Sequence, residues 1–399
     1  MFVNRKITET SKKLSHQFGI LLITGARQAG KSTLLRKIFP RHQYLSLDDL
    51  RLRTQANESP ASFFDFYPSP VIIDEVQYAP DLLSYIKIDI DEKKFLEKNC
   101  SGGYILTGSQ KFTLMDQIKE SLAGRMAILN LNTLSVEELI DQGLELPTWT
   151  NLVYRSLYPE PFLNCKLDLR IWFETYVQAW LNRDIRQNLK HSHLQVFDKF
   201  LSLIATRIST EENFTDIAKD LGVSRLTVQS WSALLEKTQV LFFLQPYYKN
   251  LGKRIIKSPK IYFFDTGLAN YLSGFFDPQQ LSNNIMTGAF FENFVISEVI
   301  KFFENRGIKP PIYFFRDSNG LELDLIIEYH CKTLAIEIKS TDNPRKSQIK
   351  GLEKISQRLG TEVVSIVVCN SKQKLAITEK ILALPWQELP DFLQNSFRL

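Results

Sequence analysis

The stretch GILLITGARQAGKSTLL, residues 19–35, joins an apolar run to a glycine-rich loop and decides the fold of the N-terminal part. The run from Gly19 to Thr24 predicts a β-strand buried on both faces, as in parallel sheets. The next eight residues, Gly25 to Ser32, spell GxxxxGK[ST], the phosphate-binding P-loop, and a helical pattern follows from Thr33 to Phe39. A P-loop between a buried strand and a helix is the context in which this motif binds nucleotides. We therefore expect an α/β domain that binds ATP.

The residue types of the loop suit phosphate and magnesium. Glycines let the backbone wrap around the phosphates, and the N–H groups at the helix start face the anion. Lys31 can reach the β and γ oxygens, and the Ser32 hydroxyl can hold Mg²⁺. The expected nucleotide-binding residues are Gly25, Arg27, Gly30, Lys31, Ser32 and Thr33.

Four more short apolar runs follow at residues 43–47, 70–73, 104–107 and 127–131. Helical or mixed stretches separate them, which predicts alternating strands and helices around a parallel sheet. We expect this P-loop ATPase domain to cover residues 1–145.

The second of these runs ends in two acids, Asp74 and Glu75, about 40 residues after the P-loop. Asp74 is expected to contact Mg²⁺ directly or through water. Glu75 is expected to orient or deprotonate the water that attacks ATP. Because the P-loop and this acidic pair occur together, they predict hydrolysis as well as binding; a decayed site that binds without turnover is the alternative.

Three further polar residues are candidates for the same reaction. Ser109 and Gln110 follow the strand at 104–107, where a side chain can touch the γ-phosphate or the lytic water. Arg125 follows a helix, and its guanidinium could reach transition-state charge in its own or a neighbouring subunit. Action in a neighbour would require a homo-oligomer, and the plain alternative for Arg125 is a surface ion pair.

The runs ITGARQAGKSTLL, IIDEVQYAPDLL, ILTGSQKF and ESLAGR together resemble the prokaryotic AAA+-type ATPases whose C-terminal half is a domain of unknown function. The later runs SPKIYFFDTGLANYL, ELDLII and IEIKS also resemble that family. The resemblance covers nearly the whole chain. It implies an ATPase domain followed by a C-terminal domain of unknown function, with the motifs in the same order as in that family.

Between these regions, residues 146–200 carry aromatic residues at helical spacing and predict a helical linker. Residues 201–275 read as helix, turn, helix and a β-like run, which predicts a winged helix. Arg225, Thr227 and Gln229 would project from its second helix toward DNA, and Lys253, Arg254 and Lys257 could meet phosphates. Packing against a neighbouring domain is the equal alternative.

The segment 285–399 predicts a second α/β unit with an unusual set of charges. Glu337 and Lys339 share one face of an expected strand, and Asp324 lies across a hairpin from Glu337. Glu292, on an expected helix at 289–304, can lean into the same pocket. Acid from a helix, Asp on one strand and Glu-x-Lys on the next looks like the PD-(D/E)XK nuclease core, a restriction-endonuclease-like α/β fold.

In that interpretation Glu292, Asp324 and Glu337 hold a metal ion and Lys339 orients or acidifies the attacking water. Arg316 and Gln348 are weaker candidates for contacts to phosphate. The alternative is that Glu337 and Lys339 form only an exposed ion pair of small energetic worth.

The composition excludes some classes and leaves others open. The 399 residues carry 44% hydrophobic and 23% charged residues, which is typical of folded proteins and not of disordered chains. Four scattered cysteines give no zinc or disulfide pattern. No window approaches the ~20 apolar residues of a membrane span, so we expect no membrane partner and a cytoplasmic location. The net charge of +5 allows nucleic-acid contact without requiring it.

Two functions follow as hypotheses. The first is an ATP-hydrolysing protein that couples nucleotide state to a metal-dependent nuclease-like module acting on or binding nucleic acid. The second is a nucleotide-dependent switch or scaffold that binds a protein or DNA partner and cleaves nothing.

Overall fold

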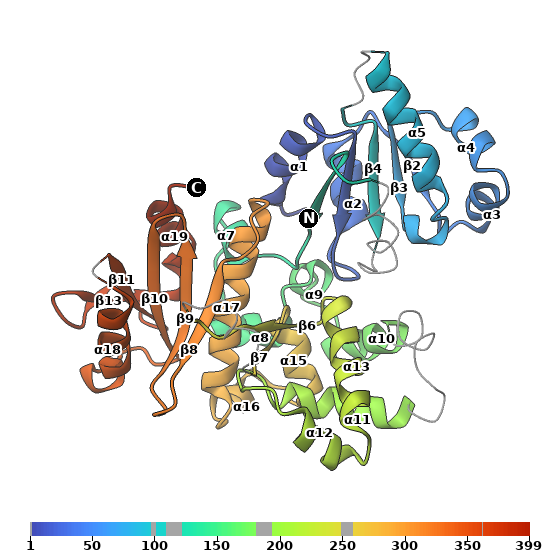
Figure 1. Ribbon diagram of the computed structural model, residues 1–399. Coiled ribbons are helices and arrows are strands. Elements are labelled where there is room, and N and C mark those ends of the chain that lie inside the picture. The colour runs from blue at the N-terminus through green and yellow to red at the C-terminus, as the bar shows by residue number, and fades with distance from the viewer. Residues whose placement is uncertain (1, 97–100, 109–121, 181–193, 249–257, 361) are drawn as a thin grey trace.

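The computed structural model describes residues 2–96, 101–108, 122–180, 194–248, 258–360 and 362–399. Within these residues it has a five-stranded sheet near the N-terminus, a six-stranded sheet near the C-terminus and a two-stranded hairpin in the helical region between them (Figure 1). No helix in the described part of the chain is both long enough and apolar enough to cross a membrane.

The N-terminal sheet has the order β2-β3-β4-β1-β5, and its neighbouring strands are parallel. β1, β3 and β4 are buried along their whole length, as their continuous apolar runs predict. β4 lies beside the P-loop strand β1. The elements of this part are α1 Ile7–Ser15, β1 Ile20–Thr24, α2 Lys31–Ile38, β2 Gln43–Ser46, α3 Leu50–Glu58, α4 Pro60–Phe66, β3 Val71–Asp74, η1 Val76–Tyr78, α5 Leu82–Phe95, β4 Tyr104–Gly108 and β5 Met126–Asn130.

Short helices and one β-hairpin make up the middle of the chain. Ser224 caps the second helix of the predicted helix-turn-helix by accepting a hydrogen bond from the N–H of Thr227, and Gly222 ends the first helix in the left-handed conformation. The elements are α7 Val136–Asp141, α8 Trp149–Arg155, α9 Pro159–Leu163, α10 Leu169–Trp180, α11 Leu194–Ala205, α12 Phe214–Leu221, α13 Arg225–Lys237, β6 Leu241–Leu244, β7 Lys260–Phe263, α15 Thr266–Leu272 and α16 Pro278–Ser282.

The C-terminal sheet has the order β12-β13-β11-β10-β9-β8. Antiparallel pairing joins β8 to β9 and β9 to β10, whereas β10, β11 and β13 run parallel. The elements are α17 Thr287–Asn305, β8 Ile312–Arg316, β9 Glu322–Tyr329, β10 Lys332–Lys339, η5 Lys346–Ile349, α18 Lys350–Leu359, β11 Val363–Cys369, β12 Leu375–Ala376, β13 Ile381–Pro385, η6 Trp386–Glu388 and α19 Leu389–Phe397. Sequence analysis expected helix α17 and the β9–β10 hairpin of this unit, but not β12, β13 or α19.

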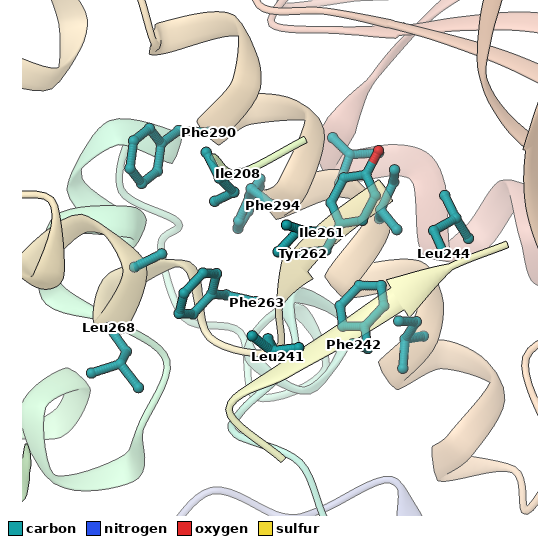
Figure 2. Close-up of a cluster of buried hydrophobic side chains, with 14 of the residues drawn as sticks. Ile208, Leu241, Phe242, Leu244, Ile261, Tyr262, Phe263, Leu268, Phe290 and Phe294 are labelled. Atoms are coloured by element: carbon teal, nitrogen blue, oxygen red, sulfur yellow. The ribbon is translucent and has the colours of Figure 1, made fainter. Parts of the chain in front are cut away.

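One apolar core runs through the middle and C-terminal parts. It contains side chains of α8, α10, α11 and α13, of the β6–β7 hairpin, and of α17. Figure 2 shows its centre, where Phe242 and Phe263 of the hairpin lie near Phe294 of α17. The helices of residues 146–200 therefore pack into the same core as the predicted winged helix.

Helix α17 is the element that joins the two sheets. It packs against β10 of the C-terminal sheet, β5 of the N-terminal sheet and the hairpin strand β7, and Figure 1 shows it between these parts. Most of its residues are buried, on several faces of the helix. Of the two candidate sites described below, the C-terminal one includes a residue of α17, and the P-loop site contacts the segment after β5 that α17 binds.

Candidate functional sites

The P-loop lies between β1 and α2, as predicted. Gly25 has a φ of 152°, and a Cβ at this position would collide with the carbonyl oxygen of Leu131. Gly30 has a φ of 94° and directly precedes α2. Both positions need glycine because other residues rarely adopt such backbone angles. Of the remaining predicted loop residues, Arg27 is half-buried and Thr33 is exposed on the first turn of α2.

Lys31 is the first residue of α2 and is only 7% exposed. Its Nζ donates to the carbonyl oxygens of Gly25 and Ala26, both at 2.9 Å. The ammonium group therefore lies inside the curve of the loop, where the phosphates of a nucleotide would bind.

Asp74 ends β3 and is 5% exposed. The Ser32 hydroxyl donates to its Oδ2 at 2.7 Å, and the hydroxyls of Tyr44 and Thr107 also donate to it. Burial and the neighbouring Asp74 raise the pKa of Tyr44 to about 12, so Tyr44 stays protonated and keeps donating. The structure thus brings together Ser32 and Asp74, the two predicted magnesium ligands, whose oxygen atoms suit Mg²⁺.

Glu75 follows Asp74 with a φ of 56°, which is uncommon for a residue other than glycine. This turn directs the chain away from the strand, and the side chain of Glu75 accepts a hydrogen bond from the amide of Gln77. Such strained positions often occur at functional sites. Tyr44, Thr107 and Gln77 were not predicted as site residues. The folded sheet brings Tyr44 and Thr107 to Asp74, whereas Gln77 lies only two residues after Glu75 in the chain.

Arg125 and the P-loop of its own chain lie at opposite ends of two neighbouring parallel strands, β5 and β1. Arg125 directly precedes β5, whose first residue pairs with Ile20 at the start of β1, whereas the P-loop follows the end of β1. A strand of this length separates the two by about 15 Å at 3.3 Å per residue. The structure therefore does not bring Arg125 to its own P-loop.

Instead, Arg125 forms a two-point ion pair with Asp91 of α5, with Nε–Oδ1 and Nη2–Oδ2 distances of 2.6 Å and 2.9 Å. Arg125 holds the pKa of Asp91 below its ordinary value through this contact. Ser109 and Gln110, the other predicted catalytic candidates, lie outside the described residues, as do Lys253, Arg254 and Lys257.

In the C-terminal sheet, Asp324 and Glu337 meet across the β9–β10 hairpin, as predicted. Asp324 Oδ2 accepts a hydrogen bond from the N–H of Ile338 at 2.7 Å, and Lys339 Nζ lies 3.6 Å from the same oxygen. Lys339 Nζ also lies 2.6 Å from Glu337 Oε1. The interpretation of the Glu-x-Lys pair as only an exposed ion pair does not hold, because Asp324 and Glu337 are each 8% exposed.

Glu337 has an incomplete set of partners. Its Oε2 is buried and accepts no hydrogen bond within the described residues. Burial and the neighbouring Asp324 raise the pKa of Glu337 to about 8. A buried carboxylate oxygen without a donor beside a second acid is an environment that a cation would stabilise.

Glu292 of α17 lies close to this pair but is engaged elsewhere. Its Oε1 accepts from Tyr262 Oη at 2.5 Å and from Lys260 Nζ at 3.2 Å. Burial and Asp324 together raise the pKa of Glu292 to about 7. Among the described residues, no three Asp, Glu, His or Cys side chains are grouped so as to hold a metal ion. Asp324 and Glu337 therefore lie together as a pair of acids, and Glu292 does not complete a set of three.

The weaker candidates of this region lie at its margin. Arg316 is half-exposed and contacts Glu211 at 3.1 Å, and Gln348 accepts a hydrogen bond from the N–H of Arg345. Sequence analysis did not single out Lys260, the first residue of β7. A signal was present: Lys260 and Tyr262 alternate with apolar residues, so both face the same side of β7.

Three family models match successive parts of the chain. Residues 17–140 match the AAA domain. The N-terminal part is an AAA-type, ATPase-like P-loop domain. Residues 146–279 match a domain of unknown function, DUF8612, and residues 287–389 match another, DUF4143. The resemblance to AAA+-type ATPases with a C-terminal domain of unknown function is confirmed at this level, and the AAA match supports ATP as the nucleotide.

Two uncharacterized proteins are similar to this chain over most of its length, at low sequence identity. The uncharacterized protein Rv2008c of Mycobacterium tuberculosis is 25% identical over 95% of this chain and 82% of its own length. The uncharacterized protein MJ1637 of Methanocaldococcus jannaschii is 22% identical over 92% of this chain and 84% of its own.

Among solved structures, the Walker-type ATPase PABY2304 of Pyrococcus abyssi is 15% identical, with a TM-score of 0.44 over 68% of this chain and 96% of that one. AMPPCP-bound DnaA of Aquifex aeolicus is 15% identical, with a TM-score of 0.27 over 58% of this chain and 85% of that one.

Proposed function

We propose that the chain is an ATPase whose nucleotide state controls a C-terminal, nuclease-like acidic site that acts on or binds nucleic acid. The observation that carries this proposal is helix α17. One of its residues, Glu292, lies in the acidic cluster, by which we mean Glu292, Glu322, Asp324 and Glu337. Residues nearer the C-terminal end of α17 bind the segment that follows β5 of the AAA domain. The division into residues 1–145, 146–200, 201–275 and 285–399 belongs to the same proposal.

In the AAA domain, Lys31 stabilises the phosphate charge of ATP and Glu75 orients or deprotonates the attacking water. Ser32 and Asp74 would hold Mg²⁺, which supplies charge neutralisation on the phosphates when bound. The hydrogen bond from Gln77 holds the Glu75 side chain in position. Ser109 and Gln110 complete the proposal as sensor residues.

A short series of contacts connects the P-loop to α17. Arg5 donates to the P-loop carbonyl of Ala29 at 2.9 Å and to the carbonyl oxygen of Thr133 at 3.1 Å. In the same segment, the carbonyl oxygen of Leu134 accepts from Lys301 Nζ at 2.9 Å. Lys301 belongs to α17 and lies nine residues from Glu292, about 13 Å along a helix. A displacement of the P-loop backbone thus has a direct route to the acidic cluster.

The polar contacts at that end of α17 are numerous. Glu298 accepts from the N–H of Val136 at 2.6 Å and pairs with Lys301 at 2.8 Å. Glu304 accepts from the amides of Asn130 and Asn132 at 2.7 Å and 2.5 Å. Because these groups are largely buried, separating α17 from this segment would leave unpaired polar atoms, which is costly.

At the acidic cluster, Asp324 and Glu337 would hold a divalent cation, which supplies a Lewis acid next to a bound phosphate. Lys339 lies between the two carboxylates, where its ammonium can orient the attacking water and stabilise phosphate charge. Burial alone would lower the pKa of Lys339, but Asp324 and Glu337 raise it above its ordinary value. Lys339 therefore acts as a fixed positive charge and not as a base.

The basic residues on and just before helix α18, which covers the face of β10 that carries Glu337 and Lys339, favour nucleic acid as the ligand. The side chains of Ala335, Glu337 and Lys339 lie on the same face of β10. On this face Ala335 packs against Leu352 and Ile355 of α18. The outer side of that region is basic. Its exposed cations, which make no ion pair within the described residues, are Arg345, Lys346, Lys350 and Lys354. Such a row of charges suits the phosphate backbone.

The helix pair α12 and α13 adds a second candidate contact with DNA. Arg225 is exposed at the start of α13, whereas Thr227 and Gln229 are half-buried. We expect Arg225→Ala to weaken binding of duplex DNA and to reduce the steepness with which affinity falls with salt. Unchanged affinity across salt concentrations would assign α12 and α13 to packing only.

The deciding experiment measures cleavage of single-stranded, duplex and branched DNA and of RNA, with Mg²⁺ or Mn²⁺, with and without ATP. Glu337→Gln is the control because it removes the charge and keeps the shape. Cleavage that is lost in this variant supports the nuclease, and its dependence on ATP reports the coupling. No cleavage of any substrate by the wild-type protein would contradict it.

Coupling through α17 is tested by Glu298→Gln combined with Lys301→Met. This pair removes one buried charge of each sign, so it keeps the net charge and touches neither site. We expect ATP turnover to persist while the effect of ATP on nucleic-acid binding or cleavage disappears. Thr10→Val, which removes a hydrogen bond from α1 to the carbonyl oxygen of Asn305, is the matched control.

A switch or scaffold without cleavage is the second candidate. It is favoured by the contacts of Glu292, whose carboxylate is engaged by Lys260 and Tyr262. In this case nucleotide-dependent binding of nucleic acid would be unchanged by Asp324→Ala. Metal-dependent cleavage that disappears in Asp324→Ala would eliminate this candidate.

A further inference from the structure

Lys260 brings a buried positive charge into the acidic cluster from outside the C-terminal sheet. It is the first residue of β7, and its side chain is 4% exposed. Its Nζ lies 2.5 Å from Glu322 Oε1 and 3.2 Å from Glu292 Oε1, and 5.4 Å from the centre of the Phe314 ring. The residue belongs to the segment matched by DUF8612, whereas the acids belong to the segment matched by DUF4143.

The cluster has more acids than internal cations. Lys260 and Lys339 are its largely buried ammonium groups, and Arg316 approaches Glu322 from the surface at 3.8 Å. The carboxylates around them are Glu292, Glu322, Asp324 and Glu337. Because buried charges are stable only when paired, each cation that enters the cluster reduces the attraction for the next one.

Lys260 is firmly held in this position. Burial alone would lower its pKa, but Glu292, Asp324 and Glu322 raise it above the ordinary value, so the ammonium stays charged. The N–H of Tyr247, just after β6, donates to the carbonyl oxygen of Phe314 at 2.6 Å, and the N–H of Phe314 donates to the carbonyl oxygen of Gln245 at 3.1 Å. These bonds fasten the hairpin to β8, beside the cluster.

We infer that Lys260 is the resident counter-ion of the acidic cluster and that it competes with a divalent cation for Glu292 and Glu322. This inference rests on the proposed function because it concerns the same site. It explains why Glu292 does not join Asp324 and Glu337: its Oε1 is already bound by an ammonium group and by the Tyr262 hydroxyl.

The test measures Mn²⁺ binding to the full-length protein by calorimetry and by electron paramagnetic resonance, without nucleic acid. Lys260→Met should bind Mn²⁺ with a dissociation constant at least about tenfold lower than the wild type, because a unit positive charge that repels the cation is removed from among the carboxylates. Lys260→Arg, which keeps the charge, should stay near the wild-type value. Lys374→Met removes an exposed lysine paired with Glu388 in the same part of the chain and serves as the matched control.

Unchanged or weaker Mn²⁺ binding in folded Lys260→Met would overturn the inference, as would absence of Mn²⁺ binding in both proteins. Circular dichroism checks folding, and Lys260→Gln, which keeps an N–H donor for Glu292, replaces the methionine variant if that one does not fold. The proposed nuclease is judged separately by the cleavage panel. Tighter Mn²⁺ binding without any cleavage would keep the counter-ion and reject the nuclease, and cleavage with unchanged Mn²⁺ affinity would do the reverse.

Discussion

Arg5 and Glu138 form an ion pair that is buried on both sides. The Arg5 side chain is 4% exposed and that of Glu138 is fully buried, and Nε lies 3.0 Å and 3.1 Å from the two carboxylate oxygens. The same guanidinium donates to the P-loop carbonyl of Ala29 and to the carbonyl oxygens of Asn132 and Thr133. One side chain from the N-terminal segment thus connects the nucleotide loop to the start of α7.

From this pair we predict that Arg5→Met lowers the free energy of unfolding by about 3–5 kcal/mol, because the buried Glu138 carboxylate loses its charged partner and keeps only the N–H groups of Lys6 and Ser135. ATP binding should weaken as well, since the loop loses a hydrogen bond at Ala29. Urea unfolding and nucleotide titration measure the two effects. Arg51→Met, at an arginine whose side chain is 93% exposed, is the control; equal stability of the two variants would contradict the prediction.

Lys31→Ala should abolish ATP turnover and weaken nucleotide binding, because the ammonium group inside the loop is lost. Steady-state hydrolysis and binding of a fluorescent ATP analogue measure this. Lys37→Ala, an exposed position on the same helix, should leave both quantities unchanged. Normal hydrolysis in Lys31→Ala would remove the P-loop from the reaction.

Glu75→Gln should keep ATP bound and slow its hydrolysis by about 10²-fold or more, because an amide cannot accept the proton of the attacking water. A single-turnover assay separates this effect from binding. Glu58→Gln, an exposed acid of α3, is the matched control. Wild-type turnover in Glu75→Gln would mean that another group activates the water.

We predict that Arg125 acts on a neighbouring subunit, because its own P-loop lies at the other end of the strands; the alternative is that it forms only its ion pair with Asp91. We expect Arg125→Ala to reduce turnover at least about tenfold, whereas Asp91→Ala, which breaks the ion pair and keeps the arginine, should stay active. Mixing Arg125→Ala with Lys31→Ala should then restore part of the activity, since one mixed interface has both residues intact. Full activity of Arg125→Ala would leave the arginine only its ion pair with Asp91.

The raised pKa values in the acidic cluster predict a pH dependence of stability. The pKa of Glu337 rises from 4.5 to about 8, so between these values the folded protein holds a proton that the unfolded chain has released. Stability should therefore fall as pH rises through this window. Urea unfolding in the presence of EDTA should show a smaller fall for Glu337→Gln than for the wild type. Glu362→Gln, an exposed acid near β11, should behave as wild type, and an equal fall in all three proteins would contradict the prediction.

The sheet of the AAA domain could be predicted because its central strands are continuous apolar runs. Polar residues of the nucleotide site directly follow two of these runs: the P-loop follows β1, and Asp74 ends β3. Asp74 and the P-loop meet at the carboxyl ends of parallel strands, so a local pattern predicts their proximity. The hairpin of Asp324 and Glu337 was predictable for a similar reason: a short turn fixes which residues face each other.

The contacts that could not be predicted are those between residues far apart in the chain. Lys260 was not predicted to lie among acids, because the local sequence does not reveal that Glu292 and Glu322 pair with it. Arg5 gave no signal, since its partner is more than a hundred residues away. The position of Arg125 relative to the P-loop required the order and direction of the strands, which no local pattern contains.

The burial of α17 limits how the protein can be divided. A fragment that begins near residue 285 would contain this helix and the sheet of β8 to β13, but it would lack the helices and the hairpin that cover Phe291, Phe294 and their neighbours. The polar groups that bind the segment after β5 would also lose their partners. Such a fragment should aggregate, so the acidic site has to be studied in the intact chain. A proteolytic cut after β5 would leave two pieces that still hold together through this helix.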